Sequence, residues 1–219
     1  MFCPGLPKFK PEKLLHAQQF TEFIAPIICD ADLSLSMRFH DISDKGKSGA
    51  LLSVKGNVTQ KINKKWVLVA RVTSTLMLGG IGGFGFKGKY PPLKVSKHAD
   101  TKPDRIVEEQ TFPQQTFLYR LRHDQNPLHV DIRVAKKCKY DNILFHGHCI
   151  HSITARVICE QYLDNDDSRL KSILVRFVKF LHPGELLIIK FWLKEGGVIF
   201  EVSVKGRNIL VMIGEADFS

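Results

Sequence analysis

Long apolar runs are absent from this sequence of 219 residues, although 44% of the residues are hydrophobic. A helix that spans a membrane needs about 18 or more consecutive apolar residues, so we expect no membrane span. The first residues, Met1-Phe-Cys-Pro4, contain neither the basic nor the apolar part of a signal peptide. The last residues, Asp217-Phe-Ser219, do not form the Ser-Lys-Leu address of peroxisomal proteins. We therefore expect no targeting signal in these two segments.

The sequence also has few cysteines, and none of them forms a Cys-x-x-Cys pair. The cysteines are Cys3, Cys29, Cys138, Cys149 and Cys159. Because their number is odd and their density is low, they do not indicate a disulfide framework. We therefore expect reduced thiols in an intracellular compartment.

Acidic residues are fewer than basic ones, with 22 Asp and Glu against 32 Lys and Arg, and the formal net charge is +10. A positive net charge favours an anionic partner. The basic residues are scattered along the chain, however, and form no block with interleaved aromatic residues. Since no nucleic-acid-binding motif is present either, we expect no binding of nucleic acid.

Alternating apolar residues and turn formers predict an antiparallel meander in the first half of the chain. The predicted strands cover residues 14–28, 31–39, 50–60 and 65–78, with polar turns at residues 44–48 and 61–64.

A glycine-dense segment at residues 79–86 follows the last of these strands, and a linker rich in proline and lysine is predicted at residues 90–104. The glycine-dense segment is either a phosphate-cradling loop or a mobile loop. Because no Gly-Lys-Ser/Thr follows it, the sequence favours the mobile loop.

The second half combines strands with one long helix. We predict a short strand from Arg105, a short helix over residues 130–137 and a long helix over residues 147–163. The long helix is apolar on nearly all sides, which indicates a helix enclosed by other elements. Turn formers separate four further predicted strands, over residues 170–181, 185–194, 197–205 and 208–215.

An acid, an amide and an imidazole occur within six residues, in the segment Asp124-Gln-Asn-Pro-Leu-His129. Pro127 fixes its own φ and moves Asn126 away from helical geometry, so we expect a turn or loop on which the polar groups converge. A carboxylate beside an imidazole that titrates near neutral pH is suited to handling one water molecule. A polar turn without a function is the alternative.

A histidine and a glycine stand at the start of the long predicted helix, in the segment His146-Gly-His-Cys149. The N–H groups at a helix N-terminus lack partners within the helix and lie at the positive end of its dipole. Glycine there lets a ligand approach the backbone closely. Such a position binds phosphate or stabilises an oxyanion that develops on a carbonyl. The two segments together indicate a site for chemistry next to a carbonyl.

These segments resemble the signature of the R-specific enoyl-CoA hydratases of the MaoC-like family, most closely the hydratase unit of the peroxisomal multifunctional β-oxidation enzyme. The family pattern is an aromatic residue, a small residue, Gly-Asp-x-Asn-Pro-Leu-His and a later His-Gly-x-Cys. His123 departs from this pattern, because the family has glycine there. We expect this difference to affect the activity more than the fold. The matching residues are Asp124, Asn126, Pro127, Leu128, His129, His146, Gly147 and Cys149.

The resemblance implies an α+β double hot-dog fold, with two antiparallel curved sheets of which the second wraps a long central helix. Residues 1–90 would form an N-terminal half that accommodates the acyl chain, residues 91–104 the linker, and residues 105–219 the catalytic half. The first half shows no helix comparable to that at residues 147–163. We therefore expect it to be truncated at its start or completed by a partner subunit, and we expect a homodimer.

The resemblance also implies an activity, the reversible hydration of a trans-2-enoyl-CoA to the R-3-hydroxyacyl-CoA in fatty-acid β-oxidation. His129 would act as base on the water, Asp124 would supply a proton to the α-carbon, and Asn126 would position the water. The Gly147 N–H would polarise the thioester, with His146 and Cys149 as further substrate-binding residues. Coenzyme A is part of the substrate, and no cofactor is expected. The implied location is the peroxisome, with the cytoplasm as the alternative.

Two other functions remain open on the sequence. A hot-dog module that binds acyl-CoA without turnover is the alternative to an enzyme. A zinc site formed by His146, His148, Cys149 and His151 is a further possibility, but these spacings place the side chains on different faces of a helix. No second Cys/His pair lies at a zinc-site distance, so we expect no metal.

Overall fold

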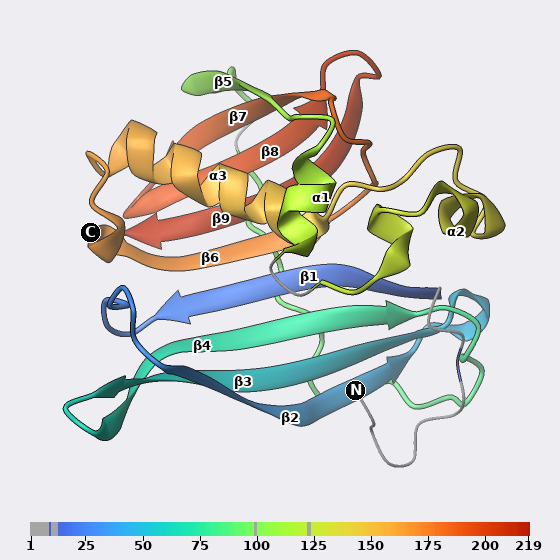
Figure 1. Ribbon diagram of the computed structural model, residues 1–219, viewed down its shortest axis with the longest axis horizontal. Coiled ribbons are helices and arrows are strands. Elements are labelled where there is room, and N and C mark those ends of the chain that lie inside the picture. Colours follow the sequence, from blue (N-terminus) through green and yellow to red (C-terminus); the bar gives the residue numbers. More distant parts are fainter. Residues whose placement is uncertain (1–8, 10–12, 99, 122–123) are drawn as a thin grey trace. The chain divides into compact units, whose positions relative to one another are not determined.

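The computed structural model describes residues 9, 13–98, 100–121 and 124–219, and these residues form two compact units (Figure 1). The first unit contains the described residues up to Lys94, together with Ser168–Leu174 and Phe218. The second unit contains Val95–Asp167, Val175–Asp217 and Ser219. Among the described residues, no helix has both the length and the apolar character that crossing a membrane requires.

The first unit contains an antiparallel sheet with the strand order β2-β3-β4-β1. Its strands are β1 (Leu14–Phe23), β2 (Leu33–Asp44), β3 (Ala50–Ile62) and β4 (Lys65–Leu78). The predicted meander is therefore confirmed, and β4 has the predicted bounds. The β3–β4 turn is shorter than expected, because only Asn63 and Lys64 lie between the strands. Their φ values of 47° and 66° suit a two-residue hairpin turn whose central residues both have positive φ.

One face of β2 carries exposed apolar side chains. Leu33, Leu35, Met37 and Phe39 alternate along the strand and are between 38% and 57% exposed, as side chains on one face of a strand do. The described part of the first unit contains no α-helix, and its 3-10 helix η2 spans Gly46–Ser48. The expectation that the first half lacks a helix comparable to the long one of the second half is confirmed for the described residues.

The glycine-dense segment is a loop held by a carboxylate. Asp44 accepts hydrogen bonds from the backbone N–H groups of Gly46, Gly83 and Gly85, at 2.7, 2.9 and 2.5 Å. The bonds from Gly83 and Gly85 lower the pKa of the Asp44 carboxyl. Because these N–H groups already bind an anion of the chain itself, the structure favours a loop over a phosphate cradle.

The second unit contains three α-helices and an antiparallel sheet with the strand order β9-β8-β7-β5 (Figure 1). The strands are β5 (Arg105–Gln110), β7 (Leu186–Lys194), β8 (Gly197–Val204) and β9 (Ile209–Phe218). The helices are α1 (Gln115–Arg120), α2 (Ile132–Lys137) and α3 (Gly147–Tyr162), with the 3-10 helix η3 (Pro127–His129). A further 3-10 helix, η4 (Asp167–Arg169), contains residues of both units. The boundary between the units falls within β6 (Leu170–Phe177).

The structure differs from the sequence predictions at several elements. In the first unit, β1 ends at Phe23 rather than near residue 28, and β2 extends to Asp44 rather than ending near residue 39. α1 was not predicted, because six residues are too few to show a helical period. β6 ends at Phe177 rather than near residue 181, and the backbone N–H of Val178 instead bonds the Val211 carbonyl at 2.8 Å. β9 continues to Phe218, beyond the predicted end at residue 215.

The prediction that α3 is enclosed on nearly all sides is wrong. Its residues His148, Ser152, Arg156 and Glu160 are exposed and follow one another at the i, i+4 spacing. Arg156 forms ion pairs with Glu160 and with Glu109 of β5, at 2.5 and 2.6 Å. The opposite side is buried through Ile150, Thr154, Val157 and Ile158. α3 therefore buries one face and leaves a polar stripe exposed.

Candidate active site

The segment from Asp124 to His129 folds through hydrogen bonds of its own side chains. The Asp124 carboxylate accepts the backbone N–H of Asn126 at 2.9 Å, and the Asn126 side-chain oxygen accepts that of Leu128 at 3.1 Å. Asn126 thereby caps η3, with Pro127 at the first helical position, where its missing N–H costs nothing. Leu128 is buried and anchors the segment.

His129 is oriented by the main chain. Its Nδ1 lies 2.8 Å from the carbonyl oxygen of Leu144. Because a carbonyl can only accept, Nδ1 carries the proton, and Nε2 keeps the lone pair of a base. Burial lowers the pKa of His129, against the opposing effects of the Leu144 hydrogen bond and the Asp124 carboxylate. The ring is therefore neutral at pH 7.

His146 is the N-cap residue of α3 and lies against both catalytic candidates. Its side chain is 3% exposed, and its Nε2 lies 3.4 Å from an Asp124 carboxylate oxygen. The ring stacks on that of His129 with centroids 3.8 Å apart. Burial, followed by the neighbouring His129, lowers the pKa of His146 to about 4. At pH 7 the His146 imidazole is therefore neutral, and its contact with the Asp124 carboxyl group is not an ion pair.

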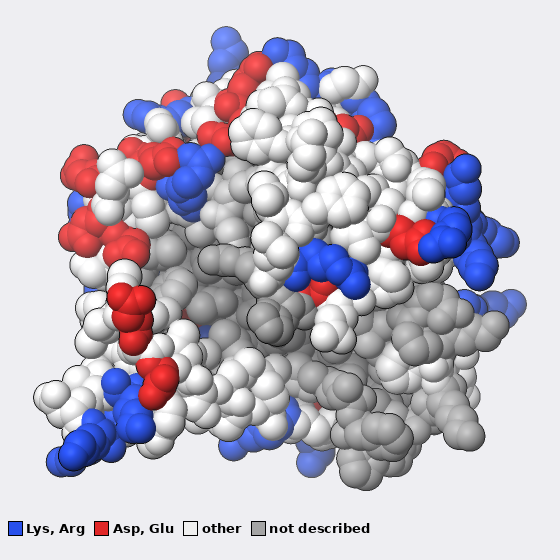
Figure 2. Space-filling model, in the orientation of Figure 1, with Lys and Arg blue, Asp and Glu red and all other residues white. Residues whose placement is uncertain are grey.

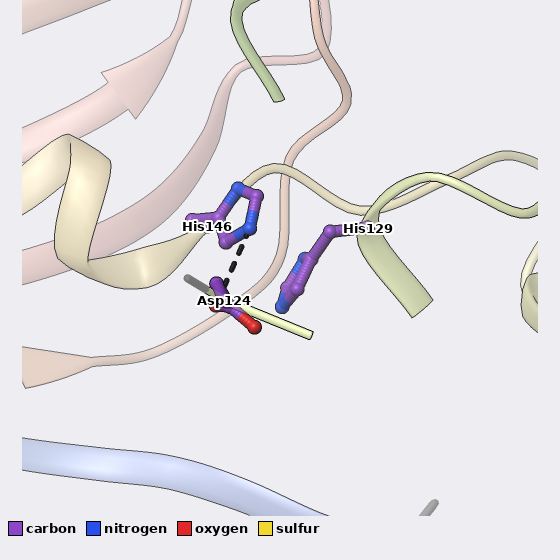
Figure 3. A group of neighbouring side chains, drawn as sticks. All are labelled: Asp124, His129 and His146. Atoms are coloured by element: carbon purple, nitrogen blue, oxygen red, sulfur yellow. Dashed lines mark ion pairs between the residues drawn. The ribbon is translucent and has the colours of Figure 1, made fainter. Parts of the chain in front are cut away.

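Figure 3 shows how Asp124, His129 and His146 converge, with the His146–Asp124 contact drawn as a dashed line. One oxygen of Asp124 and one ring nitrogen of each histidine lie within 4.8 Å of one another. The structure therefore brings together the acid and the imidazole that the sequence singled out. Two imidazoles and a carboxylate could also ligate a metal ion, so the absence of a metal site stays a prediction.

Gly147 is the first residue of α3, and no side chain caps the N–H groups at this end of the helix. An added Cβ at Gly147 would lie 3.1 to 3.4 Å from three atoms of the Phe177 ring, which is closer than nearly all real Cβ contacts. A side chain at position 147 would therefore require the Phe177 ring of β6 or the helix start to shift by a few tenths of an ångström.

The other residues near the start of α3 point to different neighbours. Cys149 is buried, and its Sγ accepts a hydrogen bond of 3.4 Å from Gln115 of α1. The His148 ring lies 6.3 Å from that of His151 and 6.5 Å from that of Phe177. Burial lowers the pKa of His151 to about 4, and desolvation by the surrounding residues lowers that of His148, although part of its side chain remains exposed. The zinc set considered from the sequence thus does not converge on one point.

Three contacts of the site were not found from the sequence. Tyr119 of α1 lies 4.4 Å from the His146 ring, Phe177 packs against Gly147, and the Leu144 carbonyl orients His129. An aromatic residue five positions before Asp124 was visible in the sequence, but nothing indicated its partner. His123, at which the family pattern has glycine, lies outside the described residues.

Two family models match the chain. A model described as "MaoC like domain" matches residues 94–212, and one described as "MFE-2 hydratase 2 N-terminal domain" matches residues 2–80. The first covers the whole of the site from Asp124 to Gly147, and the second covers the strands of the first unit.

Similar proteins are known from sequence and structure. The chain is 32% identical to "Enoyl-CoA hydratase 2, peroxisomal" of Arabidopsis thaliana over 98% of its own length and 71% of that protein. It is 33% identical to "Peroxisomal multifunctional enzyme type 2" of Mus musculus over 95% of its length, but spans only 28% of that protein. A crystal structure of a MaoC-like dehydratase from Phytophthora capsici superposes with a TM-score of 0.88 at 30% identity, covering 98% of this chain and 72% of that one.

These matches extend over nearly the whole chain and include the segments that form the site. The chain therefore belongs to the family of proteins with a MaoC-like domain.

Proposed function

We propose that this chain catalyses the reversible hydration of trans-2-enoyl-CoA to R-3-hydroxyacyl-CoA in fatty-acid β-oxidation. The observation that carries the proposal is the meeting of Asp124 with a neutral His129 beside the N-terminus of α3 (Figure 3). Relatives named enoyl-CoA hydratase 2 support the reaction.

In the proposed reaction, His129 Nε2 takes a proton from a water molecule whose oxygen bonds to C3 of the substrate. Asp124 gives a proton to C2, which is the role that the resemblance implies for it. The products are then a carboxylate and an imidazolium less than 4.8 Å apart, and proton return from His129 to Asp124 restores the site. General acid–base catalysis of this kind contributes about 10²–10⁴-fold to a rate.

The start of α3 would stabilise the charge that builds on the thioester oxygen. An N–H group at a helix N-terminus is a fixed donor at the positive end of the dipole, and such a donor contributes about 10²–10³-fold. We assign this role to Gly147. Asn126 uses its side-chain oxygen to cap η3, which leaves its amide NH₂ to hold the water. His146 and Cys149 complete the proposed substrate-binding set.

The wider setting of the reaction is also proposed. The substrate is an acyl-CoA thioester, and no separate cofactor is needed. The fold would be a double hot-dog whose first half accommodates the acyl chain and whose second half is catalytic. The peroxisome is the proposed location, as in the names of several relatives, and a homodimer is the proposed assembly.

The test is the loss of enoyl-thioester absorbance when the purified chain meets crotonyl-CoA or decenoyl-CoA, with the chirality of the product determined by chromatography. We expect turnover and R-3-hydroxyacyl-CoA. Tight binding of either thioester without turnover would instead support the module that only binds acyl-CoA. An S product would contradict the assignment to R-specific hydration.

Gly147→Ala should lower kcat/KM for the enoyl-CoA by about 10- to 100-fold, because the new methyl group would collide with the Phe177 ring and move the helix start. The matched control is Gly206→Ala, since a Cβ at Gly206 would have no atom within 4 Å. Steady-state kinetics of both variants check the prediction. Equal kinetics of Gly147→Ala and the unchanged chain would show that the helix start has room for a side chain.

The pH dependence of kcat/KM should follow the ionisation of His129. Burial lowers its pKa below the ordinary value of 6.5, and the base works only when it is unprotonated. On the acid side, the rate should therefore decline only below about pH 6.5, where His129 becomes protonated. A profile of kcat/KM, with circular dichroism at each pH to exclude unfolding, measures this. An acid limb centred well above 6.5 would contradict the assignment of His129 as the base.

A further inference from the structure

A cluster of unpaired lysines ends the short helix that follows the catalytic segment. Residues 132–140 contain Arg133, Lys136, Lys137 and Lys139, and no acidic residue. Arg133 is neutralised by Asp131, which it contacts through Nε and Nη2 at 3.1 and 2.9 Å. The three lysines are exposed, and none of them forms an ion pair with any residue that the structure describes. We name these three residues the α2 lysines.

Two of the α2 lysines lie in the last turn of α2 and Lys139 lies two residues after it, and this helix is fixed to the catalytic segment. Ala135 of α2 is fully buried and packs in one cluster with Leu128 and Leu144. Leu128 precedes His129, and the Leu144 carbonyl holds the His129 ring. The backbone N–H of Asp131, at the start of α2, also bonds the Pro127 carbonyl at 2.8 Å. The position of the lysines relative to His129 is therefore set by a small core.

Three uncompensated charges in four positions create a local positive potential. Cations at the C-terminal end of a helix also complement its dipole, but one lysine would suffice for that. Figure 2 shows basic side chains projecting from the place that α2 occupies in Figure 1. Such a patch raises the local concentration of an anion and holds it when it arrives.

We propose that the α2 lysines bind the phosphates of the coenzyme A moiety of the substrate. This inference rests on the proposed function, which places the thioester at His129. An acyl-CoA carries its diphosphate and its 3′-phosphate at the far end of a flexible pantetheine arm. A lysine ammonium on a long stem is a mobile point charge that suits phosphates reached through such an arm. By contrast, the exposed Arg71 is already paired with Glu22 at 3.1 Å.

The experiment replaces Lys136, Lys137 and Lys139 with glutamine in one variant of the full chain. For crotonyl-CoA, KM should rise by about 10- to 100-fold while kcat stays within about twofold, because the phosphates bind equally in the ground and transition states. For crotonyl-pantetheine, which has the same thioester but no nucleotide, KM should be the same in the variant and the unchanged chain. Rising salt should raise KM for crotonyl-CoA strongly in the unchanged chain and weakly in the variant.

The matched control variant removes the same charge elsewhere, by replacing the exposed Lys65, Lys102 and Lys171 with glutamine. It should leave KM for crotonyl-CoA within about twofold, since these residues lie outside the proposed subsite. An unchanged KM in the α2 variant would overturn the inference, and so would an equal rise for crotonyl-pantetheine, because the lysines would then act through the fold. If the unchanged chain hydrates neither thioester, it is the proposed function that fails.

Discussion

Replacing Asp124 with asparagine should lower kcat for enoyl-CoA hydration by about 10²–10⁴-fold. An asparagine side-chain oxygen can still accept the N–H of Asn126, as the carboxylate does at 2.9 Å, so the turn should form. What is lost is the group that donates a proton to C2 of the substrate. Steady-state kinetics with crotonyl-CoA measure the effect, and thermal unfolding of the variant should match that of the unchanged chain.

The control for Asp124 is Asp141→Asn, which removes an exposed carboxyl group from the bend before Ile143. This variant should retain kcat within about twofold, as is usual for an exposed surface substitution. If Asp124→Asn turned over substrate at the normal rate, Asp124 could not be the acid, and the proposed mechanism would be wrong.

Replacing His129 with asparagine should cost kcat about 10²–10⁴-fold as well. The asparagine NH₂ falls near the position of His129 Nδ1 and can still donate to the Leu144 carbonyl, which the imidazole does at 2.8 Å. The substitution thus removes the basic Nε2 and keeps the anchoring hydrogen bond. The decline of activity at low pH should disappear from the residual rate of this variant.

A second histidine offers a matched control in the same unit. His182 Nδ1 lies 2.9 Å from the Ile143 carbonyl, next to the carbonyl that holds His129. His182→Asn should keep kcat within about twofold, because this ring is outside the group formed by Asp124, His129 and His146. Equal losses in the two variants would mean that both histidines act only by holding the segment between them.

The strands of the first unit could be predicted because their sequence carries two independent signals. Alternation of apolar residues predicted the strands, and turn-forming residues predicted where they end. Lys65–Leu78 was predicted at both ends, since Asn63 and Lys64 precede it and two glycines follow it. The conformation of the glycine-dense loop could not be predicted, because its N–H groups bind Asp44, about forty residues earlier in the chain.

The exposure of α3 was mispredicted for a related reason. His148, Ser152 and Arg156 are separated by mostly apolar residues, so the average hydrophobicity of the segment hides their common face. What makes that face favourable is the ion pair of Arg156 with Glu109, which belongs to a strand some fifty residues away. Single-residue hydrophobicity contains no information on such a partner.

The polar residues of the site were visible in the sequence, but their supports were not. Pro127 and Asn126 predict a turn by local rules, and the turn forms as a capped η3. The resemblance alone indicated His146, as a substrate-binding residue, and nothing in the sequence indicated that its buried ring packs against His129, Asp124 and Tyr119. The Leu144 carbonyl and the Tyr119 ring have no sequence signature, because a main-chain acceptor and a packed ring depend on where distant segments meet.

The partner behind His129 decides how strong a base it can be. A histidine backed by a buried carboxylate has its cationic form stabilised by a full negative charge, whereas the Leu144 carbonyl offers only a dipole. In the proposed mechanism, the Leu144 carbonyl therefore stabilises the imidazolium form of His129 only weakly, and this imidazolium readily gives its proton back. If His129 is the base, its return to the neutral state after each turnover then needs little energy, in the direction of hydration and in that of dehydration.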